Sequence, residues 1–183
     1  MAIDKYVTES FVLASYEAGE HDITYKLFTK EFGLIFARAT SVRKLPSKLR
    51  AHLKVGYMTR VTLVKGKELW RITGGEEYHC EDILRYDVVK LLERFVRGEG
   101  VQKTLFTHMK EILSTRNIDE RTGRLLAHYL ALVDLGYADA NVIGARSIEQ
   151  YVSWNIDDLY TQAILTKDTI RPHVMQVMGQ MQL

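Results

Sequence analysis

Residues 33–64 read GLIFARATSVRKLPSKLRAHLKVGYMTRVTLV, and they combine two β-forming segments with a basic connection between them. Apolar and polar residues alternate at both ends of the stretch, as is typical of half-buried strands. The stretch contains Pro46 and no acidic residue, and its cations are Arg38, Arg43, Lys44, Lys48, Arg50, Lys54 and Arg60. It therefore predicts two strands joined by a long, positively charged loop rather than by a tight hairpin.

Three more segments with the same alternation surround this stretch: SFVLASYE at residues 10–17, DITYKLFT at 22–29 and ELWRIT at 68–73. Glycines in the breaks between the segments permit the turns that strand connections need. Five short strands are too few for a sandwich of two full sheets, but they suit a small, strongly curved barrel. We therefore expect a five-stranded β barrel of the oligonucleotide-binding (OB) fold class.

The hydrophobic period changes from two to 3.6 after the Gly74-Gly75 pair, and this change predicts a helical C-terminal half. The apolar faces of three helices comprise Val88, Leu91, Leu92, Phe95 and Val96, then Leu105, Phe106, Met109, Ile112 and Leu113, then Leu125, Leu126, Tyr129, Leu130, Leu132 and Val133. The predicted class is thus α+β, with an N-terminal five-stranded OB-fold β barrel in residues 1–78 and a C-terminal α-helical bundle in residues 79–183.

Shorter helices are expected after the third one, which should end at Gly136. Ser147 and Gln150 have the spacing of a capping box before YVSW. A last helix over residues 166–181 should be interrupted or kinked near Pro172, because proline lacks the backbone N–H that a helix interior requires.

The charge of the chain is strongly segregated, although its formal net charge is only +2. Residues 26–71 contain twelve basic and two acidic residues, so that 12 − 2 = +10, whereas the flanking segments are mildly acidic. Such a field attracts polyanions. The predicted DNA-binding residues are Lys26, Lys30, Arg38, Arg43, Lys44, Lys48, Arg50, Lys54, Arg60 and Arg71. The alternative interpretation is a solvated face that serves solubility.

Four aromatic residues in the basic segment could stack on nucleic-acid bases: Tyr25, Phe28, Tyr57 and Trp70. Strand alternation favours a core position for most of them, with one or two facing outward.

The sequence offers little support for catalysis, a cofactor or a metal. The segment EEYHCED at residues 76–82 is rich in metal-ligand residue types, but no partner motif accompanies it, and a polar linker is the favoured interpretation. The single Cys80 cannot form an internal disulfide, which fits a reducing compartment. The N-terminus shows no signal sequence and no membrane span, so we expect a cytoplasmic, non-enzymatic protein.

The ordered motifs of the chain resemble RecO, the bacterial DNA repair and recombination mediator. The resemblance begins at about residue 10, and its first motifs are Gly19-Glu20, the strand end Leu27-Phe28-Thr29, Gly33 in a hairpin, and Ser47-Lys48-Leu49 at the end of the basic connection. It continues in LLERFVRGEGVQKTLFTHMKEIL and in LLAHYLALVDLGY, up to residue 137. RecO proteins commonly follow LGY with paired cysteines that hold zinc, but this chain has no cysteine after Cys80, so we expect no zinc module.

The resemblance implies a nucleoid-associated protein that binds single- and double-stranded DNA, anneals complementary strands, and helps to load recombinase. RecR and the acidic, apolar tail of the single-strand binding protein are the implied partners. The residues predicted to receive the tail are Lys110, Arg116, Arg121, Arg124, Leu125 and His128, although the arginines could instead pair with Glu111, Asp119 and Glu120. Two other classes stay open: an adaptor whose barrel binds an acidic protein, and a nuclease that uses the acids of residues 76–82.

Overall fold

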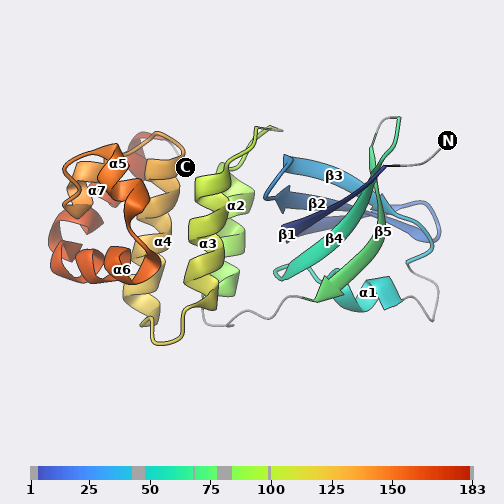
Figure 1. The fold of residues 1–183 in the computed structure, drawn as a ribbon, viewed down its shortest axis with the longest axis horizontal. Helices are drawn as coiled ribbons and strands as arrows, with labels where there is room; N and C mark the ends of the chain where they lie inside the picture. Colours follow the sequence, from blue (N-terminus) through green and yellow to red (C-terminus); the bar gives the residue numbers. More distant parts are fainter. Residues whose placement is uncertain (1–3, 43–47, 68, 78–83, 99, 182–183) are drawn as a thin grey trace. The chain divides into compact units, whose positions relative to one another are not determined.

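The structure is a computed structural model, and it describes residues 4–42, 48–67, 69–77, 84–98 and 100–181 (Figure 1). The chain divides into two compact units. The barrel unit comprises Met1–Cys80 and Leu92–Lys103, and the helical unit comprises Glu81–Leu91 and Thr104–Leu183. The predicted boundary between residues 78 and 79 lies outside the described residues.

The barrel unit contains five strands: β1 (Lys5–Ala18), β2 (Asp22–Thr29), β3 (Gly33–Ala39), β4 (Met58–Lys65) and β5 (Trp70–Glu77). They close in the order β1-β2-β3-β5-β4, and β4 returns to β1. Every pair is antiparallel except β3 and β5, which run parallel. The predicted five-stranded OB-type barrel is therefore confirmed.

The long strand β1 makes closure possible because it pairs with two neighbours. Its first part pairs with β4 from Lys5 to Phe11, and its second part pairs with β2 from Ser10 to Ala18. The register shifts between Val12 and Ala14, and such bulges bend a strand and increase its twist. The alternating residues that face inward form a dry core: Val12, Tyr25, Leu27, Ile35, Ala37, Ala39, Val61, Leu63 and Ile72.

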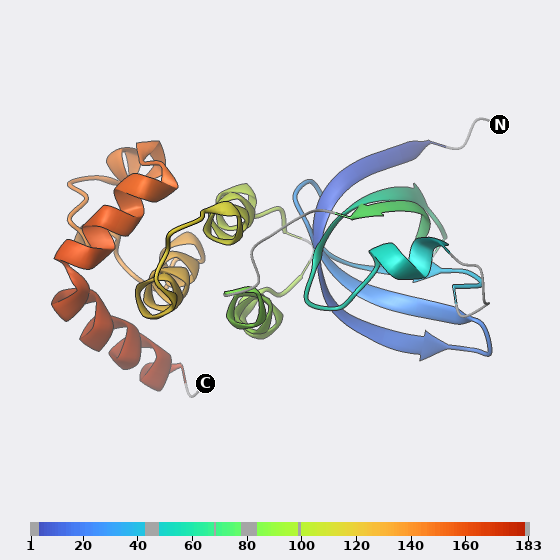
Figure 2. The ribbon, with the colours of Figure 1, turned by 90° about the horizontal axis from the view of Figure 1, so that it is seen from below.

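The connection between β3 and β4 contains a short helix, α1 (Lys48–His52), so the prediction of a loop throughout is wrong there. Figures 1 and 2 show α1 covering one side of the barrel. Leu53 joins the barrel core, with Leu49 packed against it. A Cβ atom at Gly75 of β5 would lie 3.1 Å from Leu49 Cδ1, so the helix approaches β5 where the strand has no side chain. This apolar contact explains why a basic segment becomes helical.

The remaining helices are α2 (Arg85–Phe95), α3 (Lys103–Ser114), α4 (Glu120–Asp134), η1 (Ala140–Ile143), α5 (Ile148–Ser153), α6 (Ile156–Leu165) and α7 (Lys167–Gln180). The predicted apolar faces of α2 and α3 are buried, and so is that of α4 except for Leu125, which is half-buried. No helix among the described residues is long and apolar enough to cross a membrane.

The helix ends test the predictions that were made from capping residues and from proline. Asp119 caps α4, and hydrogen bonds, above all from the side chain of Thr122, lower the pKa of Asp119 to about 2.

Ser147 caps α5 as predicted, but Gln150 Oε1 accepts from Arg146 N and does not complete a capping box at Ser147. Of the expected interruption or kink at Pro172, the interruption is wrong, because α7 continues through this residue as a helix. Ile170 and Val174 are buried on either side, and this packing compensates for the missing hydrogen bond.

A buried polar network connects three helices of the helical unit. His108 Nδ1 of α3 lies 2.7 Å from Asp134 Oδ2 at the end of α4, and Tyr151 of α5 donates to Asp134 Oδ1 over 2.9 Å. Their side chains are buried, with 6% of His108 and 2% of Asp134 exposed. Burial, assisted by the negative charge of Asp134, raises the pKa of Tyr151. The network therefore positions α3, α4 and α5 in one arrangement.

Candidate nucleic-acid interface

Two arginines on neighbouring strands lie directly opposite each other on the outside of the barrel. Arg38 of β3 and Arg71 of β5 are partners in the parallel register, and both are exposed. Their neighbours Ala37, Ala39 and Ile72 face the core, which fixes the arginines on the outer face. Like charges directly opposite one another disfavour a sheet. An anion bound between the two guanidinium groups would relieve this repulsion.

Lys26 of β2 extends the same outer face. It pairs with Phe36 of β3, and its neighbours Tyr25 and Leu27 point into the core. Lys30 lies just after the end of β2, half-buried. We call Lys26, Arg38 and Arg71 the outer basic cluster.

Acidic residues partly balance two of the predicted DNA-binding arginines. Arg38 Nε lies 3.9 Å from Asp22, and Arg60 Nη1 lies 3.9 Å from Glu76. Arg60 is also the register partner of Glu9 on β1, so acids flank it on both sides. Long, exposed ion pairs of this kind contribute little to the stability of the fold. Arg60 is nevertheless the weaker candidate, because its neighbours reduce the local positive potential.

The other predicted cations surround α1. Arg50 and Lys54 are exposed, and the Lys54 ammonium lies 5.5 Å from the centre of the Tyr57 ring. Burial raises the pKa of the Tyr25 hydroxyl, and the positive charge of Arg50 opposes that rise. Arg43 and Lys44 lie outside the described residues, as does the side chain of Lys48.

The most exposed aromatic pair of the barrel lies outside the four aromatic residues that were considered from the sequence. Tyr25 and Phe28 are buried, and Tyr57 and Trp70 are half-buried. Tyr16 and Phe36 are instead exposed, with ring centres 6.4 Å apart. Phe36 and Arg38 are two positions apart on one strand and therefore face the same side. The sequence alternation could thus have identified Phe36 as an outward-facing residue.

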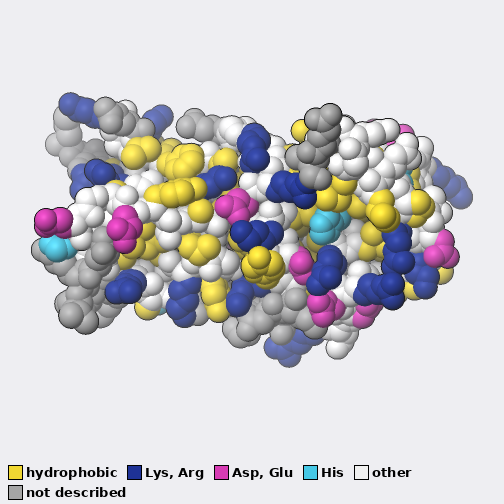
Figure 3. Space-filling view, turned by 180° about the vertical axis from the view of Figure 1, so that it is seen from behind, with side chains coloured by type: hydrophobic (Ala, Val, Ile, Leu, Met, Phe, Trp, Pro, Cys, Tyr) yellow, Lys and Arg dark blue, Asp and Glu magenta, His cyan; other side chains and the backbone are white. Residues whose placement is uncertain are grey.

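Figure 3 shows one face of the molecule, where dark blue cations and yellow apolar side chains lie close together on the barrel part. Acidic side chains, drawn in magenta, lie on the same face.

In the helical unit, the predicted tail-binding arginines have different environments. Arg124 forms ion pairs with Asp87 at 3.0 Å and with Glu120 at 2.6 Å. The hydrogen bond to Asp87 raises the pKa of Arg124, and the Asp87 charge adds to the effect. The alternative of acid pairing therefore holds for Arg124, with Glu120 as expected and Asp87 as an additional partner.

The other predicted tail-binding residues occupy α3, α4 and the turn between them. Arg121 and Arg116 are exposed, whereas Lys110 and Leu125 are half-buried. His128 Nδ1 lies 2.8 Å from the carbonyl oxygen of Arg124, so the imidazole is oriented by its own helix.

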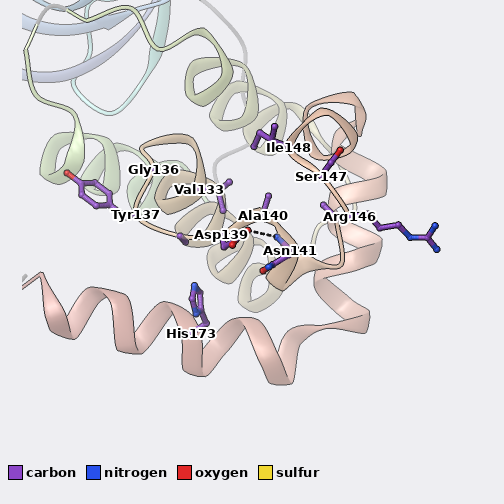
Figure 4. A pocket seen from close by; sticks show the side chains of 12 residues that line it. Val133, Gly136, Tyr137, Asp139, Ala140, Asn141, Arg146, Ser147, Ile148 and His173 are labelled. Atoms are coloured by element: carbon purple, nitrogen blue, oxygen red, sulfur yellow. Dashed lines mark hydrogen bonds between the residues drawn. The ribbon is translucent and has the colours of Figure 1, made fainter.

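A cavity of about 700 Å³ lies in the helical unit beside the LGY sequence, residues 135–137 (Figure 4). Tyr137, η1, the start of α5 and His173 of α7 line it. His173 projects toward Asp139, and its Nε2 atom is buried without a hydrogen-bond partner. Residues that could form a metal centre, three or more of His, Cys, Asp and Glu, are not grouped anywhere in the described ranges.

Comparison with known proteins identifies the relatives of the barrel. Residues 1–79 match the family described as "Recombination protein O N terminal". The predicted resemblance to RecO is confirmed for this segment, which includes all five barrel strands. A protein named DNA repair protein RecO from Dehalococcoides mccartyi is 37% identical over 71 residues, which cover 39% of this chain. The RecO protein of Heliobacterium modesticaldum is 35% identical over 98 residues, which cover 54% of this chain.

The matched segments span 28% and 36% of these two RecO relatives. The family match includes Lys26, Arg38 and Arg71, so the outer basic cluster belongs to the region with RecO similarity.

Proposed function

We propose that the chain is a DNA-binding recombination mediator that acts in recombinational DNA repair. Its barrel binds single- and double-stranded DNA through phosphate contacts, and it promotes annealing of complementary strands. The observation that carries this proposal is the in-register pair Arg38 and Arg71, with Lys26 on the same outer face of an OB-type barrel. The names of the RecO relatives support the assignment to DNA repair.

The physical requirement of annealing matches this surface. Two DNA strands repel each other until their phosphates are neutralised, and cations that neutralise phosphates release the condensed counterions. Contacts to phosphate carry no sequence information, so the bases stay available for pairing. Exposed cations on a sheet therefore suit annealing better than deep pockets that enclose single bases.

The proposed partners follow the RecO relationship. The barrel would cooperate with RecR in loading recombinase, and the helical bundle would receive the acidic tail of the single-strand binding protein. We propose a barrel domain of residues 1–78 and a helical domain of residues 79–183 that functions without zinc, other cofactors or catalysis. The protein would work in the cytoplasm at the nucleoid.

The tail site has a direct test at Arg121, the exposed arginine near the start of α4. Arg121→Glu is expected to weaken binding of a synthetic tail peptide about tenfold, because a cation that meets a carboxylate becomes a repelling acid. Oligonucleotide affinity should stay within about threefold, since phosphate binding is proposed for the barrel. Fluorescence anisotropy of labelled peptide and labelled oligonucleotide measures both.

Arg171→Glu on α7 is the matched control, because it makes the same charge change at another exposed site of the helical unit. Equal effects of Arg121→Glu and Arg171→Glu on peptide binding would place the tail elsewhere.

The function itself is tested by annealing of complementary strands coated with single-strand binding protein. The chain should accelerate duplex formation measured by fluorescence quenching between strand labels. Unchanged annealing together with absent DNA binding at low salt would contradict the proposal and favour the adaptor. Metal-dependent strand cleavage would instead indicate a nuclease.

A further inference from the structure

We propose that Tyr16 and Phe36 form a stacking platform for unpaired bases on the outside of the barrel. This inference rests on the proposed function, and it identifies how the same surface distinguishes single strands from duplex. Tyr16 is 49% exposed and Phe36 is 42% exposed, and their rings lie 6.4 Å apart with an angle of 40° between the planes.

The position of the two rings follows from the strand register. Tyr16 of β1 is opposite Thr24 of β2, and Phe36 of β3 is opposite Lys26 of β2. The two aromatic side chains therefore approach each other diagonally across β2. The bulge between Val12 and Ala14 sets the register of the second part of β1, to which Tyr16 belongs.

The cations around the rings identify the ligand as nucleic acid. Lys26 is the register partner of Phe36, and Thr24, opposite Tyr16, is the register partner of Arg38. Arg71 continues the same row on β5. An exposed aromatic pair bordered by cations on neighbouring strands matches the two parts of a nucleotide, because bases stack on the rings while phosphates meet the cations. An acidic protein partner would use the cations but would gain little from the rings.

Stacking also explains how a bound strand can still anneal. A base that lies on an aromatic ring presents its face to the protein, and its hydrogen-bonding edge stays free for the complementary base. Bases within a duplex are already stacked on each other and do not offer their faces. The platform should therefore strengthen binding of single strands and leave duplex binding to the cations.

Replacing both rings by leucine tests the platform while retaining apolar side chains on the sheet. Tyr16→Leu with Phe36→Leu should weaken binding of an oligo-dT strand at least about tenfold, since each base stacked on an aromatic ring adds substantially to affinity. Affinity for a duplex of equal length should change less than about twofold. The salt dependence of single-strand binding should keep its slope, because no phosphate contact is removed.

Two further variants serve as controls. Tyr16→Phe with Phe36→Tyr keeps both rings and should bind oligo-dT like the original chain. Tyr86→Ala removes an exposed tyrosine from α2 in the helical unit and should leave both affinities unchanged. Thermal unfolding of each variant shows whether the barrel is intact.

The outcomes separate this inference from the proposed function. Binding of oligo-dT and duplex by the original chain, with equal binding by the leucine variant, would overturn the platform and leave the DNA-binding proposal standing. Equal losses of oligo-dT and duplex affinity in a folded leucine variant would also overturn it, because the rings would then not distinguish unpaired bases. Failure of the original chain to bind either DNA would overturn both proposals.

Discussion

Asp134→Ala is expected to lower the free energy of unfolding of the helical unit by about 3–5 kcal/mol, because two buried polar groups lose their shared carboxylate partner. Asp134 accepts from Tyr151 and contacts His108 Nδ1 within a nearly dry site. Alanine leaves both groups without their acceptor, and water has little access to replace it. Urea denaturation followed by circular dichroism measures the difference.

Two other variants make the result interpretable. Tyr151→Phe removes only one hydrogen bond and should cost about 1–2 kcal/mol. Asp168→Ala, an exposed acid in the first turn of α7, should change stability by no more than about 0.5 kcal/mol. If Asp134→Ala behaves like Asp168→Ala, the network does not hold the three helices together.

The second large effect is expected from Arg38→Glu combined with Arg71→Glu. This change converts the in-register cations into acids and should weaken DNA binding about a hundredfold at low salt, for single strands and duplex alike. The plot of log affinity against log salt for single strands should lose about 1.4 of its slope, which is about 0.7 for each of two phosphate contacts. Fluorescence anisotropy over a salt series provides both values.

The matched control is Lys167→Glu with Arg171→Glu, which introduces the same charge change at exposed positions of α7. If the control variant loses as much affinity as the barrel variant, binding depends on the net charge of the chain and not on the outer basic cluster.

The barrel could be predicted from the sequence because apolar and polar residues alternate along its strands, and this alternation can be recognised within a short segment. Alternation in segments such as DITYKLFT determines which residues face the core, and the long basic connection between β3 and β4 was recognisable as something other than a tight hairpin. The helix α1 was missed because five residues give no clear helical period. Its stability depends on contacts of Leu49 with a glycine of β5, which only the folded barrel creates.

The surface was harder to predict than the core. Tyr16 lies beyond a bulge in β1. A bulge shifts the alternation of inward-facing and outward-facing residues, so the exposure of Tyr16 could not be derived by counting along the strand. Arg124 and Asp87 are 37 positions apart, so their ion pair could not be inferred from spacing along one helix. The His108, Asp134 and Tyr151 network likewise joins three helices. Such contacts depend on tertiary packing, whereas the basic character of residues 26–71 was evident from composition.

The most direct test of the account is the affinity of the unmodified chain for a short oligo-dT strand at about 50 and about 200 mM salt. Three phosphate contacts, one each from Lys26, Arg38 and Arg71, predict a slope near −2 and therefore a loss of affinity of about tenfold or more between the two conditions. Absence of binding at the lower salt concentration, or an affinity that does not change with salt, would contradict the claim that the barrel binds the phosphate backbone of DNA.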